Sequence, residues 1–156
     1  MKDASLDLLV LAAGILEPNG MEALDLGSIR EQFEVNALAP LRFTSALASH
    51  LVKGAKVAIL TSRMGSIGDN TSGGHYGYRM SKAALNAAGK SLAHDLAPRG
   101  VSVAILPPGF VRTRMTREHG LIDPDESARL LIERIDAMTP ETTGTFWHSN
   151  GEVLPW

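Results

Sequence analysis

The sequence contains no cysteine, few aromatic residues and no apolar run long enough to cross a membrane. The lack of cysteine excludes disulfides, thiol catalysis and cysteine-ligated metal, and it fits a reducing compartment. A net charge of −2 argues against nucleic acid or an anionic membrane surface as the main partner. The N-terminal residues do not have the pattern of a cleavable signal, so we expect a cytoplasmic protein.

Metal-ligand spacing is also missing, because the five histidines are scattered along the chain. We therefore expect no metal site. With 156 residues, 44% of them hydrophobic and 21% charged, the chain is long enough to bury a core but short for two domains. We expect residues 1–156 to form a single, partial domain.

Apolar runs that alternate with helical patterns predict an α/β fold with a parallel sheet. The strand-like runs are residues 6–12, 56–61 and 101–106. A helix is expected from the capping-box pattern at Ser28 to about Val52, with a bend near Asn36 because Pro40 cannot donate its backbone hydrogen bond. Two further helices are expected, one that contains Tyr78 and ends near residues 98–100, and one from Asp123 to about Met138.

Tyr78 and Lys82 are four residues apart in an alanine-rich helical stretch, so their side chains should share one helix face. An ammonium beside a phenol favours the phenolate, and we expect it to lower the pKa of Tyr78 from about 10 toward neutrality. Such a tyrosine can exchange protons with a substrate. Taken alone, however, the pair more often represents a half-buried aromatic residue beside a solvated lysine. The interpretation depends on the motifs around the pair.

Those motifs follow one another in a recognisable order. Ser62 comes after a strand-like run, Asn36 lies in the preceding helix, and a Pro-Gly turn follows the last run. The complete set resembles the short-chain dehydrogenase/reductase family from about Leu6 onward, and it consists of Asn36, Ser62, Tyr78-x-x-x-Lys82 and Pro108-Gly109-x-x-x-Thr113. The segments 62–67 and 143–147 are most similar to the C-factor-like carbonyl reductases of that family.

The resemblance implies a fold and a set of catalytic roles. The fold would be the C-terminal part of a Rossmann-like, doubly wound parallel sheet with flanking helices. Tyr78 would be the general acid for carbonyl reduction and the base for alcohol oxidation, and Ser62 would bind the substrate oxygen, with Ser66 as a rival for that role. Lys82 would lower the Tyr78 pKa and bind the nicotinamide ribose, while Asn36 would complete a proton relay.

The resemblance also implies a cofactor, NADP or NAD. The residues expected to bind it are Ala13, Gly14, Tyr78, Lys82, Pro108, Gly109, Val111 and Thr113. A mobile substrate lid is expected at residues 114–121. The histidines are expected to be structural or surface residues, with the substrate mouth as an alternative place for His75, which precedes Tyr78 by three residues.

One departure from the family pattern concerns the glycine-rich turn that holds the dinucleotide pyrophosphate, which this sequence does not contain. Cofactor binding is therefore expected to be weakened or lost. The strand at residues 6–12 would then lie at a sheet edge, and we expect the chain to cover that edge as a homo-oligomer.

Two functions are compatible with these observations. The first is an NAD(P)-dependent oxidoreductase that reduces a small carbonyl or oxidises an alcohol. The alternative is a truncated, inactive family member that acts as a self-association or binding module.

Overall fold

The computed structural model describes residues 5–156, which form a three-stranded parallel sheet in the order β1-β2-β3. The strands are β1 (Leu6–Leu11), β2 (Leu51–Leu60) and β3 (Ser102–Leu106). Every residue of β3 is buried, as expected for a strand covered on both faces. In the register, Val57 of β2 pairs with Leu9 on one side and Val103 on the other. The parallel α/β arrangement confirms the expected fold class.

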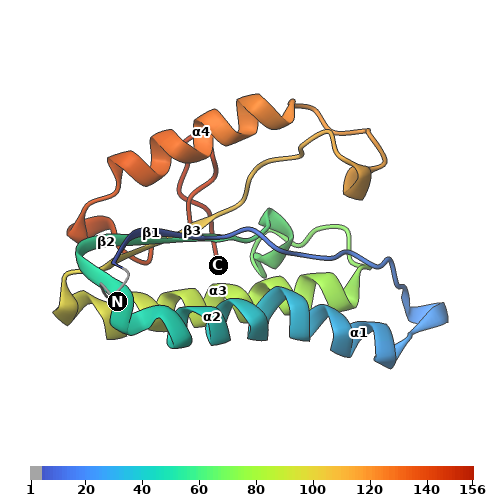
Figure 1. The fold of residues 1–156 in the computed structure, drawn as a ribbon. Helices are drawn as coiled ribbons and strands as arrows, with labels where there is room; N and C mark the ends of the chain where they lie inside the picture. The colour runs from blue at the N-terminus through green and yellow to red at the C-terminus, as the bar shows by residue number, and fades with distance from the viewer. Residues whose placement is uncertain (1–4) are drawn as a thin grey trace.

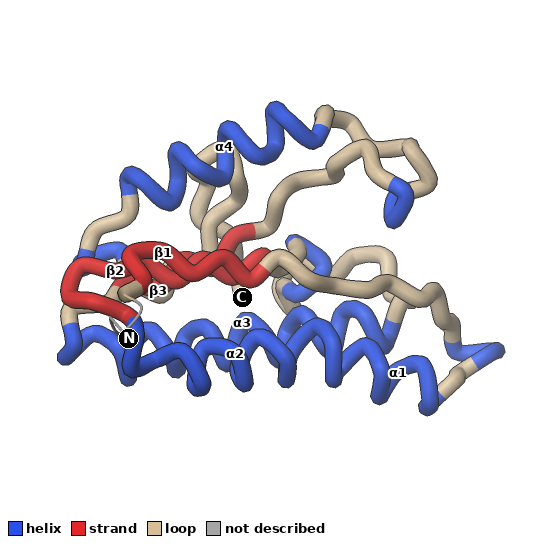
Figure 2. The backbone as a smooth tube through the Cα atoms, viewed as in Figure 1, coloured by secondary structure: helices blue, strands red, loops and turns tan. Residues whose placement is uncertain are grey.

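Helices cover both faces of this sheet (Figure 1 and Figure 2). One face carries α1 (Leu26–Phe33), α2 (Ala39–Leu47) and α3 (Tyr76–Leu96), and the other carries α4 (Pro124–Ala137). The shorter helical segments are η1 (Met21–Ala23), η2 (Glu34–Leu38), η3 (Ala48–His50), η4 (Arg63–Gly65), η5 (Ala97–Arg99), η6 (Arg114–Thr116) and η7 (Pro140–Thr142). None of the helices in residues 5–156 combines the length and the apolar character that a bilayer crossing needs.

The core is divided by the sheet into two layers, because successive strand residues point to opposite faces. Val57, Ile59 and Ile105 belong to the larger cluster, which includes residues of α3. Ala58 and Leu106 pack with residues of α4 in the smaller cluster. Gly89 allows close approach of α3 to the sheet, since a Cβ atom there would lie 2.9 Å from Cγ1 of Ile105.

The first long helix differs from the sequence prediction at both ends. Asp25, not Ser28, caps it, because the Asp25 carboxylate accepts hydrogen bonds from the backbone N–H groups of residues 27 and 28 at 2.8 and 3.1 Å. The helix ends at Leu47, and β2 already begins at Leu51, so the predicted extension to Val52 was wrong. The predicted irregularity near Asn36 is confirmed as the π-helical segment η2.

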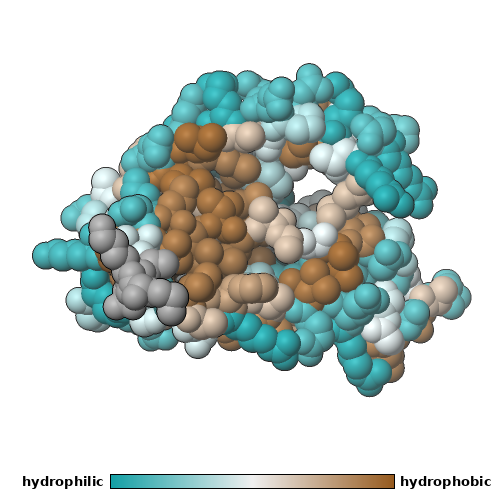
Figure 3. All heavy atoms as spheres, viewed as in Figure 1, coloured by the Kyte–Doolittle hydropathy of each residue, from teal (hydrophilic) through white to brown (hydrophobic). Residues whose placement is uncertain are grey.

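Strand β1 is an edge strand with an incompletely covered face. Leu8 and Val10 point to the α4 side of the sheet, but α4 packs over β2 and β3, so these side chains remain 46% and 47% exposed. Figure 3 shows a broad hydrophobic area on this side of the molecule, next to α4. An apolar area at a free sheet edge favours contact with another chain segment.

Candidate active site

Tyr78 and Lys82 lie together at the start of α3, and both are buried, with 7% and 4% of their surface exposed. The Lys82 Nζ atom lies 5.8 Å from the centroid of the Tyr78 ring. The preceding residue, His75, adopts a left-handed conformation with φ of 49°. Asn19 stabilises this helix start, because its carbonyl accepts from the His75 N–H at 2.8 Å and its Oδ1 accepts from the Gly77 N–H at 3.2 Å.

The Lys82 ammonium is buried and contacts the backbone at the end of β2. Its Nζ donates to the carbonyl of Leu60 at 3.0 Å, and within residues 5–156 no other hydrogen-bond acceptor is recorded for it. Gly14 leaves space beside it, since a Cβ atom there would lie 3.4 Å from Nζ and 3.3 Å from the Asn36 Oδ1. Burial lowers the pKa of Lys82 to about 8, because the charged form is poorly solvated. The ammonium can therefore donate further hydrogen bonds. It also loses its proton more readily than a solvated lysine does.

The expected direction of the Tyr78 pKa shift was wrong for this structure. Burial raises the pKa of Tyr78 above 10, and only the hydrogen bond with the Ser62 hydroxyl acts in the opposite direction. Lys82 does not lower it, because the ammonium is directed to the Leu60 carbonyl rather than to the phenol oxygen. Tyr78 is thus a neutral phenol near pH 7, which is the protonation state of a proton donor.

Ser62, rather than Ser66, faces the tyrosine. Ser62 follows the carboxyl end of β2 and caps η4, and its Oγ accepts from the Met64 N–H at 3.1 Å. Ser66 is 2% exposed, and its Oγ accepts from the Asp69 N–H at 3.1 Å within its own loop. The second serine is therefore occupied by local structure.

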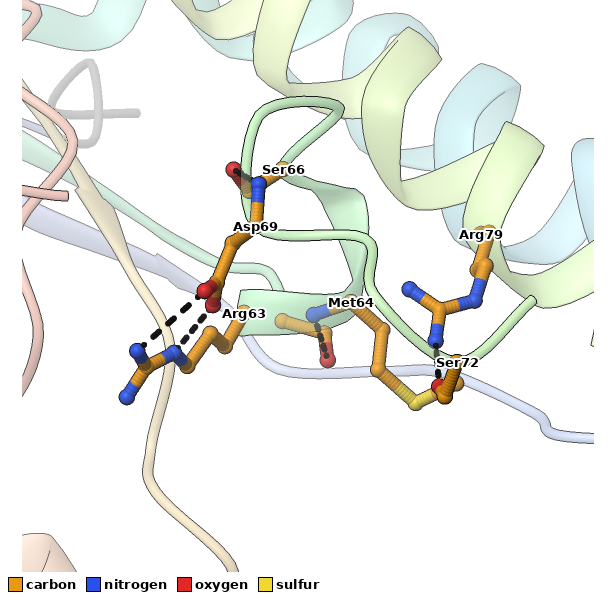
Figure 4. A network of polar contacts seen from close by, with 7 residues as sticks. Arg63, Met64, Ser66, Asp69, Ser72 and Arg79 are labelled. Carbon is orange, nitrogen blue, oxygen red and sulfur yellow. Dashed lines mark hydrogen bonds and ion pairs between the residues drawn. The ribbon is translucent and has the colours of Figure 1, made fainter. Parts of the chain in front are cut away.

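Polar contacts fix the loop between Ser62 and α3 (Figure 4). Arg63 forms an ion pair with Asp69, and the Arg79 guanidinium donates to the Ser72 hydroxyl at 2.9 Å. The Gly68 N–H donates to the backbone carbonyl of Trp156 at 2.8 Å, which attaches the loop to the C-terminal segment. The loop that carries Ser62 is thus stabilised at several points.

Asn36 connects three elements around the cluster. Its side chain is fully buried, accepts from the Ile15 N–H at 2.8 Å, and donates to the Ile15 carbonyl at 2.9 Å and the Ser81 hydroxyl at 3.0 Å. These bonds hold the loop after β1 against α3. The role of Asn36 in a proton relay stays a prediction.

The sequence interpretation missed a buried pair next to these residues. The Thr61 hydroxyl donates to the Asn86 Oδ1 at 2.6 Å, and both residues are 3% exposed. Thr61 directly precedes Ser62, so this bond attaches the end of β2 to α3 next to the candidate serine. The available signal was a second polar residue at the end of an apolar strand, directly before the candidate serine.

The turn after β3 contains the remaining predicted cofactor residues. The Pro108 carbonyl accepts from the Ser127 hydroxyl at 2.8 Å, and Gly109 has a φ of 90°, a conformation that side chains disfavour. Val111 forms a bridge with Ile122, and Thr113 begins η6. These contacts fix the shape of the turn through α4 and the segment that follows the predicted lid.

A cleft of about 980 Å³ separates the loop after β1 from the loop after β3. Figure 3 shows the molecule hollowed between these two regions. Its wall includes Gly14, Met64, His75, Phe110 and residues 114–117 of the predicted lid. The structure thus gathers Asn36, Ser62, Tyr78 and Lys82 next to Gly14. Of the predicted site residues, Gly14 lines the cleft wall, and Ala13 is exposed to solvent. No group of three metal-ligating side chains occurs in residues 5–156.

A parallel sheet covered by helices on both faces, with a serine, a tyrosine and a lysine gathered at the end of its central strand, defines a Rossmann-like α/β domain. The profile of the short chain dehydrogenase family matches residues 2–121. The chain belongs to this family of oxidoreductases.

Two relatives are similar in sequence to most of this chain. The 1-hydroxy-2-glutathionyl-2-methyl-3-butene dehydrogenase of Rhodococcus sp. (strain AD45) is 48% identical over 159 residues, which cover 99% of this chain and 70% of that protein. C-signal of Myxococcus xanthus is 44% identical over 135 residues, which cover 85% of this chain and 81% of that protein.

Solved structures show the same fold. Carbonyl reductase Sniffer of D. melanogaster superposes with a TM-score of 0.94 at 31% identity, over 99% of this chain and 68% of that chain. The NADPH-bound carbonyl reductase from chicken fatty liver gives a TM-score of 0.91 at 27% identity, over 99% and 68% of the two chains. The chain is therefore a Rossmann-fold family member that spans about two thirds of these structures.

Proposed function

We propose that this protein is an NAD(P)-dependent oxidoreductase that interconverts a small carbonyl and the corresponding alcohol through Ser62, Tyr78 and Lys82. The observation that carries the proposal is the convergence of the buried Tyr78 and Lys82 with the half-buried Ser62 at the end of β2. The cleft adjoins them through Gly14, beside Lys82, and Met64, two residues after Ser62. The two relatives and two solved structures named above favour this function over an inactive binding module.

The residues around the cleft fit a nicotinamide nucleotide. The missing side chain at Gly14 leaves space beside Lys82, whose ammonium has hydrogen-bonding capacity beyond the Leu60 carbonyl. Lys82 would hold the ribose hydroxyls, and Thr113 with the backbone of residues 108–111 would hold the carboxamide. When bound, the nicotinamide supplies or accepts the hydride. The NADPH-bound relative supports NADP, although the family accommodates either nucleotide.

Each side chain then has a separate task. Tyr78 is neutral because burial raises its pKa, so it can donate its proton to a carbonyl oxygen during reduction. The Ser62 hydroxyl, next to the phenol, would hydrogen-bond the same substrate oxygen and stabilise charge that develops there. Lys82 would favour the phenolate once the proton has moved, because a cation nearby stabilises an anion.

Fluorescence titration of the purified chain with NADPH and NADH tests the cofactor part of this proposal. Saturable binding is the expected result, with an affinity weakened because the sequence contains no glycine-rich pyrophosphate turn. The absence of binding up to millimolar nucleotide would contradict it, and would favour the inactive binding module.

Substitution of Tyr78 by Phe tests the chemical part. Because the phenol is the proposed proton donor, the variant should lose about 100 to 10,000-fold in kcat/KM with a carbonyl substrate. Tyr76, the other tyrosine of the chain, is only half-buried and forms no hydrogen bond with Ser62 within residues 5–156, so Tyr76→Phe is the matched control and should retain activity. Equal activity of the two variants would exclude Tyr78 from the chemistry.

A further inference from the structure

The cleft wall carries more positive than negative charge. Arg114 and Arg117, both exposed, line it together with His75, and Glu17 is the one carboxylate in the wall. Neither arginine forms an ion pair with a carboxylate of residues 5–156, whereas Arg112, on the same loop, is paired with Asp123. Unpaired guanidinium groups beside a cleft are suited to a carboxylate, which they can bind through two parallel hydrogen bonds.

Backbone strain is concentrated at the same place. In the part of the chain that the structure describes, the non-glycine residues with positive φ are His75, Arg117 and Glu118, at 49°, 50° and 62°. Two of them line the cleft, and the third adjoins it. Left-handed conformations of such residues cost free energy and occur preferentially at ligand sites. The surrounding structure thus keeps one arginine and the histidine of the cleft wall in a strained backbone conformation.

The rest of the wall is apolar and would contact the carbon skeleton of a substrate. Met64, Phe110 and Met115 lie in it, the first of them two residues after Ser62. The cleft therefore combines an apolar part that adjoins the Ser62 loop with a cationic part on the lid. This arrangement distinguishes the two ends of an elongated substrate.

We infer that the substrate of this site is an alcohol or carbonyl compound that carries a carboxylate, which Arg114 and Arg117 bind while the reacting group lies near Tyr78. This inference rests on the proposed function and specifies its substrate class. Glu17 lies in the same wall as the two arginines, so the wall retains a net positive charge with one carboxylate present.

A matched pair of substrates tests the inference. One is S-(2-hydroxyethyl)glutathione, a primary alcohol with two carboxylates, and the other is its diamide, in which both carboxylates are neutral amides. The readout is the ratio of kcat/KM for the diacid to kcat/KM for the diamide, measured with NADP⁺ and with NAD⁺. The ratio should exceed about ten for the unmodified chain and fall about tenfold in Arg114→Gln and in Arg117→Gln, the loss expected for one charge-assisted hydrogen bond.

The control is Arg30→Gln, because Arg30 is exposed on α1, is unpaired among the described residues and lies outside the cleft wall. Its ratio should equal that of the unmodified chain. A ratio near one for the unmodified chain, with both compounds oxidised, would overturn the inference and leave the proposed function intact.

Lack of turnover of both compounds would count against the proposed function instead. Calorimetric titration with each compound then decides the inference separately. Tighter binding of the diacid that is lost in Arg114→Gln supports it, and equal binding of diacid and diamide overturns it.

Discussion

At the scale of single residues, the charge of Lys82 couples the site to pH. Its pKa is about 8 in the folded chain and near 10.5 when solvated, so between these values the unfolded chain binds more protons than the folded one. Stability should therefore rise with pH in this window, by up to about 2 kcal/mol between pH 7.5 and 10. The raised pKa of Tyr78 acts only above pH 10, where it lowers stability as the unfolded chain ionises first.

Urea unfolding of the unmodified chain and of Lys82→Met at pH 7.5 and pH 10 measures this contribution. Between pH 7.5 and pH 10, the unfolding free energy of the unmodified chain should rise relative to that of Lys82→Met. If both proteins respond to pH equally, Lys82 is not desolvated in the folded state.

The residue scale also shows what could be read from the sequence and what could not. The motif order located Asn36, Ser62, Tyr78 and Lys82, and the structure brings these residues together. The direction of the Tyr78 pKa shift was not predictable from spacing, because it depends on burial and on the Leu60 carbonyl that accepts from Lys82. Thr61 and Asn86 were missed because a pair 25 residues apart leaves no local pattern.

At the scale of elements, the close approach of η4 to α3 depends on Gly65. A Cβ atom at this position would lie 2.8 Å from the backbone carbonyl carbon of Lys82 and 3.0 Å from the Asn86 Nδ2. Gly65→Ala should therefore displace the loop that follows Ser62 and destabilise the fold by about 1 to 3 kcal/mol, because backbone cannot yield as a side chain does.

Gly20 offers the matched control for this substitution. A Cβ atom at Gly20 would meet no atom within 4 Å, and its φ of −128° suits any residue. Gly20→Ala should leave the melting temperature unchanged or raise it slightly. Equal effects of the two substitutions would show that η4 does not need a glycine to pack on α3.

The positions of helices and strands could be predicted from apolar periodicity, but the predictions of both ends of the first long helix were wrong. The first and third strands and the helix that carries Tyr78 were located from apolar runs and spacing. The second strand was predicted at residues 56–61, but β2 spans Leu51–Leu60, so its first half was missed. The cap of α1 was predicted at Ser28 but lies at Asp25, three residues earlier. Both residues are possible caps, and it is the Asp25 carboxylate that binds the free N–H groups. The end of α2 was misplaced because the segment 48–52 carries no glycine or proline that would mark a stop.

At the scale of the whole molecule, the edge of β1 predicts self-association. Leu8 and Val10 expose nearly half of their surface on a strand with a free edge. We expect light scattering at micromolar concentration to give a mass above 16.7 kDa for the purified chain. Lysines at both positions should shift the mass toward that of a monomer, because desolvating two charges in an apolar contact is costly.

Leu24 is the control for this change, since it is also 46% exposed but lies outside the sheet. Leu24→Lys should leave the mass unchanged. A monomeric unmodified chain would contradict self-association through this edge.

The attachment of the Ser62 loop to the C-terminal segment gives the protein an internal optical probe. The indole of Trp156 stacks on Phe146 with ring centroids 5.3 Å apart, while its carbonyl holds Gly68. The only other tryptophan, Trp147, packs against the α4 side of the core. Movement of the loop would therefore alter the emission of Trp156, so that spectral shifts and quenching report on the loop in solution without an added dye.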